Sequence, residues 1–249
     1  MPSENSDRTL RAACAADRRN ADRQGMNAPP APRWTIPLHG LLTEGAWVQI
    51  GWPEESEFDA ITMLRNRPNM RRQFLDPRPL DPVRNREWLR SGMKRPYEAM
   101  LAIRLKADGV FVGAIGWSRG DAVEGSFELG RVMVDAQALL PYRARLPADY
   151  PGVAVDAGMA IRDFAFTRLA LTVIRMAVIE ANRLSLHAAL SGGGHVTGSH
   201  TERRSNGSEL RLIDLECRRD DWLRLKEHGP LPRGRSLLAS KSPVVTPSS

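Results

Sequence analysis

The sequence has few residues of the kinds that build crosslinks and metal sites. Only two cysteines, Cys14 and Cys217, occur in 249 residues, and neither has a paired Cys or Cys/His spacing, which excludes a disulfide framework and a zinc module. The five histidines show no metal-ligand spacing, so we expect no metal site. Phe, Trp and Tyr make up 6% of the chain and no recognition motif appears, so nucleic acid is not the expected partner despite an isoelectric point of about 10.1.

Long apolar runs are also missing. No stretch of about 18 apolar residues occurs, so we expect no membrane span. The first residues lack the apolar segment of a secretory signal and contain several acids, which transit peptides avoid. We therefore expect a cytoplasmic protein without a membrane partner.

The remaining composition is that of a globular protein, with 42% hydrophobic and 26% charged residues. Residues 1–33, which end in a Pro-rich joint, and the Pro-, Ser- and Gly-rich residues 229–249 are predicted to be disordered. One domain over 34–228 remains. Met26 directly precedes the Pro-rich joint, so translation could begin there or at Met1, and the sequence leaves both possibilities open.

Periodicity predicts a mixed α/β domain with a mostly antiparallel sheet flanked by helices. Strands are predicted over 46–50, 97–105, 110–117, 126–134, 171–179, 195–203 and 210–218. Helices are predicted over 53–68, from Asp81-Pro82 through Trp88-Leu89, over 153–169 and over 184–190. The nearly all-apolar stretch 171–179 is typical of a strand buried on both faces.

Several short motifs occur in a fixed order along the second half of the chain. They are DGVFVGAIG at 108–116, FELG at 127–130, GVA at 152–154, DFAF at 163–166, VIEAN at 178–182 with Ser185, and RRDDW at 218–222. In this order they resemble the GNAT N-acetyltransferases, particularly the branch of ribosomal-protein, antibiotic and amino-sugar N-acetyltransferases. The resemblance implies the GNAT fold, in which the central sheet splays between its middle strands, and acyl transfer from acetyl-CoA to an amine without a metal.

The resemblance also implies where acetyl-CoA binds. A helix N-terminus has free N–H groups and a positive dipole end that suit a pyrophosphate, and small residues allow its close approach. The matching loop and helix start place the pyrophosphate at Tyr150, Gly152, Val153 and Ala154. The matching positions for the pantetheine arm are Val132, Met133, Val134 and Asn182.

The cofactor loop departs from the family pattern. Asp149 stands where the family has Gln or Arg, and Pro151 has no N–H to donate. Either Arg143 and Arg145 compensate, or CoA binding is weak or lost and the domain is a catalytically degenerate binding module. The connection 135–148 is also longer than in the family, and is either part of a pocket or a decoration.

The mechanism that the resemblance implies is direct attack of an amine on the thioester. A base must first remove a proton from the ammonium group, and Glu128 on the splayed strand is the candidate. The alternative is a structural carboxylate paired with an arginine. The Tyr with which many relatives protonate the leaving thiolate has no counterpart at 187–189 (His-Ala-Ala), so the thiolate leaves unassisted or with water.

The acceptor is the least constrained part of the reaction. Residues 64–95 contain ten basic and three acidic side chains, so their net charge of +7 equals that of the whole chain. This is either a solvated surface or a basic rim for an anionic partner. Residues 64–72 and 87–89 resemble relatives that acylate nucleotide-linked amino sugars, so Arg71, Arg72 and Trp88 are the predicted substrate-binding residues.

We therefore predict that the acceptor is a primary amine of a small molecule, with phosphate-bearing amino sugars included. Acetylation of protein N-termini or ribosomal proteins is the alternative, although a basic rim disfavours a basic tail. The sequence also leaves a homodimer open.

Overall fold

The computed structural model describes residues 40–92, 98–121 and 124–228. The predicted disordered segments 1–33 and 229–249 lie outside the described residues, as do Met1 and Met26, the two candidate first residues. In the described part of the chain, no helix has the length and apolar character that crossing a membrane requires.

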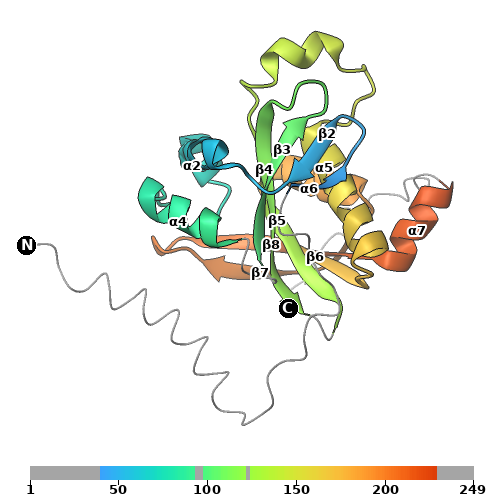
Figure 1. The fold of residues 1–249 in the computed structure, drawn as a ribbon. Helices are drawn as coiled ribbons and strands as arrows, with labels where there is room; N and C mark the ends of the chain where they lie inside the picture. Colours follow the sequence, from blue (N-terminus) through green and yellow to red (C-terminus); the bar gives the residue numbers. More distant parts are fainter. Residues whose placement is uncertain (1–39, 93–97, 122–123, 229–249) are drawn as a thin grey trace, which may run out of the picture. The chain divides into compact units, whose positions relative to one another are not determined.

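The elements follow the predicted order along the chain (Figure 1). The strands are β1 (Leu41–Glu44), β2 (Val48–Gly51), β3 (Ala99–Leu105), β4 (Phe111–Asp121), β5 (Ser126–Val134), β6 (Val173–Ile179), β7 (His195–Arg203) and β8 (Glu209–Arg218). The α-helices are α2 (Phe58–Asn66), α3 (Pro68–Arg71), α4 (Pro82–Gly92), α5 (Val153–Asp163), α6 (Arg183–Ser191) and α7 (Arg219–His228). Three short helical turns complete the described chain: η1 (Glu55–Glu57), η2 (Leu140–Arg145) and the π-helical η3 (Phe164–Arg168).

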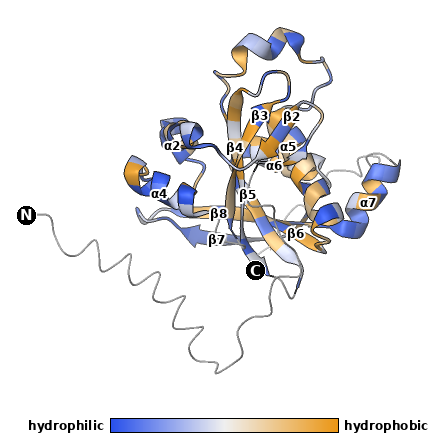
Figure 2. Cartoon of the chain, in the orientation of Figure 1, coloured by the Kyte–Doolittle hydropathy of each residue, from blue (hydrophilic) through white to orange (hydrophobic). Residues whose placement is uncertain are grey.

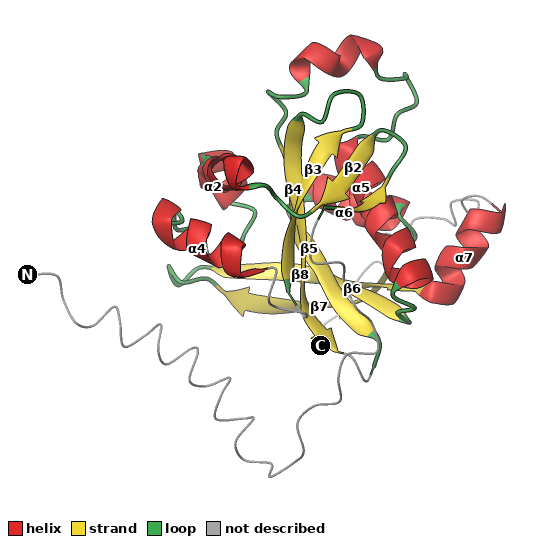
Figure 3. Ribbon diagram, in the orientation of Figure 1, coloured by secondary structure: helices red, strands yellow, loops and turns green. Residues whose placement is uncertain are grey.

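The described strands form one eight-stranded sheet in the order β1-β2-β3-β4-β5-β6-β8-β7 (Figure 3). Each neighbouring pair is antiparallel except β5 and β6, which are parallel. The predicted fold class, a mixed and mostly antiparallel sheet flanked by helices, is therefore confirmed. The parallel pair lies in the middle of the sheet, where α5 crosses from one strand to the next.

Helices cover the sheet on two faces, and each face has its own apolar cluster (Figures 1 and 2). The larger cluster joins the sheet to α5, α6 and α7 through residues such as Ile161, Leu186 and Trp222. The smaller one joins β3, β4 and β5 to α2 and α4 through residues such as Ile61 and Leu89. We call these the α5 face and the α2 face of the sheet.

Two sequence predictions require correction. The stretch 171–179 is not buried on both faces, because Ala177 is exposed and Arg175 is half-buried on the side opposite α5. The helix predicted over 153–169 is α-helical only to Asp163 and continues as the π-helical turn η3, in which the Leu169 N–H donates to the Phe164 carbonyl.

The first strand of the sheet was not predicted. Leu41–Glu44 pairs with β2 at the edge of the sheet, and its residues are exposed or half-buried. Without a buried face, such a segment has no alternation of apolar and polar residues for periodicity to detect.

Candidate functional site

The parallel strands β5 and β6 are paired over only three residues. The paired positions are Ser126 with Val173, Phe127 with Ile174 and Glu128 with Arg175. Beyond them β5 stays paired with β4 as far as Val134, and β6 with β8 as far as Ile179. The backbone edges of 129–134 and 176–179 therefore have no strand partner on the sides that face each other, and their N–H and C=O groups are available to a ligand.

A β-bulge lies directly beyond the last paired residues. Ala114 pairs with Met133 and Gly116 with Gly130, so two steps along β4 correspond to three along β5. The extra residue, Arg131, has a φ of 54°, a left-handed conformation that is rare outside glycine. Bulges redirect side chains, and this one turns Arg131 toward the α2 face at the point where the strands part.

The three predicted pantetheine positions follow the bulge. The side chains of Val132 and Val134 pack against the α5-face cluster, whereas Met133 is buried in the α2-face cluster. Their side chains are thus used for packing, and their backbone groups on the β6 side are free of strand pairing. This is the arrangement that the predicted cofactor contacts through backbone atoms require, and the contacts stay a prediction.

The helix α5 begins at the same end of the parted strands. Gly152 precedes it with a φ of 95°, and a Cβ atom built there meets no atom within 4 Å. The first N–H groups of α5, including those of Val153 and Ala154, have no acceptor in the preceding turn of the helix. An anion can therefore approach this helix end without steric hindrance, as a pyrophosphate requires.

The acid in the first turn of α5 is directed away from that position. Asp156 is buried and accepts hydrogen bonds from the backbone N–H groups of Ala46 (2.7 Å) and Trp47 (2.8 Å). The Tyr150 hydroxyl donates to the same carboxylate at 3.3 Å. Asp156 thereby fastens the β1–β2 turn to α5, and hydrogen bonds already satisfy its negative charge.

Tyr150 has fewer free groups than the prediction assumed. Its backbone N–H donates to the Pro147 carbonyl, its hydroxyl donates to Asp156, and its ring packs edge-on against Trp47. Burial and the neighbouring Asp156 carboxylate raise the pKa of Tyr150 above its ordinary value, so it stays protonated. Both of its donors thus have protein partners, which leaves the pyrophosphate prediction to Gly152 and the two residues after it.

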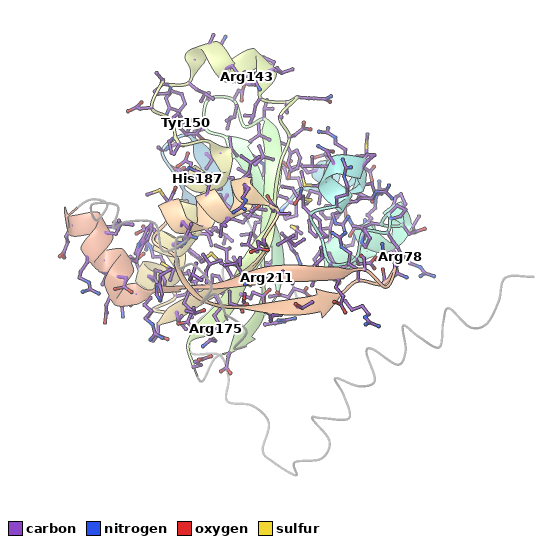
Figure 4. All side chains as sticks on the ribbon, turned by 180° about the vertical axis from the view of Figure 1, so that it is seen from behind. Arg78, Arg143, Tyr150, Arg175, His187 and Arg211 are labelled. Carbon is purple, nitrogen blue, oxygen red and sulfur yellow. The ribbon has the colours of Figure 1, made fainter. Side chains whose placement is uncertain are left out.

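The long connection between β5 and α5 is anchored to the sheet. The Tyr142 hydroxyl donates to Asp108 in the β3–β4 turn, and the ring of Tyr142 lies beside Trp47 and Leu105. Arg143 and Arg145 are exposed on η2, and Figure 4 shows Arg143 at the same end of the domain as Tyr150. Asp149 is exposed as well, and the positive charge of Arg145 acts on Asp108, whose pKa it helps to lower after the hydrogen bonds from Tyr142 and the Val110 N–H.

Asn182, the last predicted cofactor residue, is the N-cap of α6. Its Oδ1 accepts from the Ser185 N–H at 3.2 Å, so the capping role is established by the structure. His187 lies on the exposed side of the same helix, near Ser191, as expected for a surface residue (Figure 4).

Glu128, the candidate base, is the last residue of β5 before the strands part. Because Phe127 and Leu129 pack in the α5-face cluster, the side chain of Glu128 lies on the α2 face. It is 28% exposed and forms an ion pair with Arg119 at 3.0 Å. Since Arg119 is 75% exposed, this pair is weak, and Glu128 can exchange it for a substrate.

An ion-pair network holds the closed end of the parted strands together. Arg175 of β6 contacts Glu124 (2.6 Å from Nη1) and Glu216 of β8 (3.3 Å from Nε). The hydrogen bonds from Arg175 lower the pKa of Glu124 to about 2. This network fixes β5 relative to β6 at the point from which they diverge (Figure 4).

The predicted substrate-binding residues do not gather in one place. Trp88 of α4 packs on the α2-face cluster beside Arg131, whose guanidinium carbon lies 5.5 Å from its ring centroid. Arg71 and Arg72 lie at the end of α3, where the Arg72 carbonyl accepts from Arg204 of the β7–β8 turn. Of the predicted substrate-binding residues, Trp88 is thus the one beside the parted strands.

Half of the described arginines in the basic stretch, four of eight, form ion pairs with nearby acids. These pairs are Arg67–Asp135 (2.7 Å), Arg78–Asp76 (2.6 Å), Arg86–Asp59 (2.5 Å) and Arg90–Glu55 (2.8 Å). Arg65 is buried and stacks on Phe74. The ion pairs reduce the positive charge available to an anionic partner, and both interpretations of the stretch stay open.

Sequence reasoning missed Glu98 and Arg131. Glu98 directly precedes β3, and its Oε1 lies 2.7 Å from Nη2 of Arg131. The only signal in the sequence was a charged residue between Gly130 and the apolar residues 132–134, and it does not show that the strand bulges there. Within the described ranges, no three His, Cys, Asp or Glu side chains cluster so that they could hold a metal ion.

Comparison with known proteins agrees with this geometry. The family model "Acetyltransferase (GNAT) domain" matches residues 49–195. A GCN5-related N-acetyltransferase from Brucella melitensis is similar in structure, with a TM-score of 0.61 and 18% identity over 80% of this chain and 87% of that one. The spermidine N-acetyltransferase from Vibrio cholerae in complex with CoA and spermine has a TM-score of 0.61 and 16% identity over 72% and 99%. No curated protein matches the sequence of this chain.

Proposed function

The chain belongs to the GNAT acetyltransferase family, whose members use acetyl-CoA, and from this premise we propose that it acetylates a primary amine of a small molecule. The observation that carries the proposal is that two unpaired strand edges face each other at the end of the sheet where α5 begins, with open space at Gly152. An acyl-CoA has a pyrophosphate for the helix end and amide groups for the strand edges. One extended ligand thus complements both features.

In the proposed reaction the amine attacks the thioester carbonyl carbon, the C–S bond breaks and CoA leaves as a thiol. The amine must lose a proton, since an ammonium ion, with a pKa of about 10, has no free electron pair. Glu128 is the proposed base because its carboxylate lies on the α2 face, directly before the gap in which the thioester would end. Two protons leave the nitrogen on the way from ammonium to amide. Glu128 takes the first and passes it to solvent, and the second, lost from the nitrogen after attack, balances the proton that the thiolate takes up from water.

The finer proposal for the acceptor is a sugar-linked amine, based on the likeness of residues 64–72 and 87–89 to acetyltransferases of nucleotide-linked amino sugars. The position of Trp88 beside the parted strands supports this proposal. The ion pairs of the basic stretch weaken it, because they leave fewer cations for a diphosphate. A polyamine is the second candidate, since a structurally similar acetyltransferase was crystallised with spermine.

Calorimetry with acetyl-CoA tests the proposal, comparing the wild type with Gly152→Trp. A bulky side chain at Gly152 would occupy the space that a pyrophosphate needs, so we expect binding to be lost. Gly207→Trp is the matched control, because Gly207 also has a positive φ (84°) and open space around it, but lies in the β7–β8 turn. It therefore reproduces the backbone strain without the block.

Saturable binding by the wild type and by Gly207→Trp, but not by Gly152→Trp, supports the cofactor site. A release assay for the CoA thiol, run with amino sugars, polyamines and peptides, then identifies the acceptor class. If the folded wild type binds neither acetyl-CoA nor longer acyl-CoAs, the proposed catalytic activity is refuted, and the domain is a degenerate binding module.

A further inference from the structure

Arg131 occupies an unusual place for a charged residue. It is the extra residue of the β5 bulge, in the left-handed conformation, and its side chain crosses Gly116 of β4. A Cβ atom built on Gly116 would lie 3.5 Å from Cδ of Arg131. That distance is an ordinary van der Waals contact, so the Arg131 side chain lies directly over Gly116, whereas the atom that excludes a side chain at position 116 is the Ala99 carbonyl oxygen, 2.7 Å from the same Cβ position.

The surroundings hold the guanidinium by one edge. Nη2 lies 2.7 Å from the Glu98 carboxylate, and the group lies over the Trp88 ring at 5.5 Å. Nη1 is covered by neighbouring atoms and has no hydrogen-bond acceptor among the described residues. A covered arginine donor without an acceptor destabilises the fold. A hydrogen bond from Nη1 to an anion on a bound molecule would remove this cost.

The Arg131 side chain as a whole is partly exposed, although Nη1 itself is covered. The side chain of Arg131 is 34% exposed and that of Glu98 27% exposed, in contrast to the core residues around them. An anionic group on a bound molecule would reach Nη1 once the side chain turns this edge outward, while Glu98 keeps the other edge. Arginine favours such two-sided binding because its five donors lie in one plane.

Arg131 is also close to where the reaction would take place. Under the proposed function, the thioester end of acetyl-CoA lies between 129–134 and 176–179, and the pairing of Glu128 with Arg175 closes that gap. Arg131 is three residues beyond Glu128, on the same α2 face. A substrate whose amine faces Glu128 thus has Arg131 beside the next atoms of its chain.

We propose that Arg131 is a specificity-determining residue that selects an amine with a carboxylate or phosphate group a few bonds from the nitrogen. This inference deepens the proposed function and rests on it. A guanidinium attracts such an anion and repels a second ammonium group, so polyamines are poor acceptors. The same positive charge favours the neutral form of the reacting amine, which is the form that attacks.

A set of matched three-carbon amines tests the proposal. β-Alanine carries a carboxylate, 3-aminopropanamide is its neutral isostere and 1,3-diaminopropane carries a second ammonium; O-phosphoethanolamine tests phosphate in place of carboxylate. Affinities are measured by calorimetry with and without CoA, and kcat/KM by thiol release from acetyl-CoA. We expect the anionic amines to be preferred over the neutral one by about tenfold or more, and the diamine to rank last.

Variants assign that preference to one side chain. Arg131→Gln removes the charge and should make the anionic and neutral amines equal, while Arg131→Lys should restore part of the preference. Arg203→Gln is the matched control, because Arg203 pairs with Glu209 in the same way but lies on the β7–β8 hairpin. It should leave the order of the amines unchanged.

The outcomes separate the two proposals. Failure to bind acetyl-CoA refutes the proposed function, and the affinities measured without CoA still test Arg131. Equal affinity for the three amines, no binding of any of them at millimolar concentration, or a preference that survives in Arg131→Gln overturns the role of Arg131. A preference for carboxylate over phosphate, or the reverse, identifies the anion.

Discussion

The two faces of the sheet differ in what they present to a ligand. On the α5 face, a large apolar cluster and the buried Asp156 fix the helix end and the strand edges that would hold the cofactor. On the α2 face, a smaller cluster is surrounded by ion pairs, and charged side chains stand where the acceptor would bind. The cofactor side thus relies on backbone geometry, which many sequences can produce, and the acceptor side on individual side chains.

The contrast explains why the family is easier to establish than the acceptor. In the proposed site, backbone groups would recognise the acetyl-CoA that the family uses. Side chains recognise the acceptor, and one substitution there changes charge and shape together. Substitutions on the two faces should therefore have separable effects. Those on the α5 face should change the affinity for acetyl-CoA and the stability of the fold, and those on the α2 face should change turnover and the choice of acceptor.

The largest expected effect is on turnover. Glu128→Gln removes the proposed base from the α2 face, so kcat should fall by about 10²- to 10⁴-fold. The dissociation constant for acetyl-CoA should stay within about twofold of the wild-type value, because the proposed cofactor contacts are backbone groups beyond Glu128 and at the start of α5, and not the Glu128 side chain. Glu209→Gln, which removes an exposed and paired carboxylate on β8, is the control. Unchanged turnover would make Glu128 a structural carboxylate.

The next largest effect is expected on the stability of the fold, from a substitution on the α5 face. Asp156→Ala leaves the N–H groups of Ala46 and Trp47, which lie at a partly buried turn, without their acceptor, so the free energy of unfolding should fall by about 1–3 kcal/mol. Asp149→Ala, at an exposed acid in the preceding loop, should change it by less than about 0.5 kcal/mol. Urea denaturation measures both. Equal effects at the two positions would contradict the inward role of Asp156.

The smallest effect concerns the joint between the two halves of the sheet. The folded-state pKa of Glu124, about 2, lies below its ordinary value of 4.5, so its ion pair with Arg175 stabilises the fold above pH 4.5. That contribution should be lost as the pH falls from 4.5 to 2. Because both side chains are more than two-fifths exposed, it should be below about 1 kcal/mol at neutral pH.

Comparing the melting temperatures of the wild type and Glu124→Gln across this range measures the contribution. The two proteins should differ slightly at pH 7 and converge toward pH 2. A difference that does not depend on pH would show that Glu124 acts through its Ser126 hydrogen bond or its packing instead.

The sequence predicted the order of the elements well, because local signals determine them. Asp81 accepts from the Arg84 N–H at the start of α4, and Gly192 ends α6, as their residue types indicated. The strand 126–134 has the predicted bounds. By contrast, the exposed side of β6 at Ala177 depends on which helices cover the sheet, and this is decided by residues distant in sequence.

The site was predicted less completely, for a related reason. Gly152 and Glu128 belong to short motifs, so the sequence alone can propose them, but the pairing of Glu98 with Arg131 depends on a bulge that arises from the register between β4 and β5. A charge count along the sequence likewise cannot show which arginines of the basic stretch are paired. Arg67, Arg86 and Arg90 pair with Asp135, Asp59 and Glu55, which all lie outside that stretch.

The short pairing of β5 with β6 has a consequence for how the protein responds to its cofactor. The backbone amides on the unpaired edges lack the strand hydrogen bonds that slow exchange with solvent deuterium. An extended ligand with its own amide groups would supply the hydrogen bonds that are missing between the two halves of the sheet. Binding would then complete the sheet, and slower deuterium uptake confined to residues 129–134 and 176–179 would trace the ligand along its path.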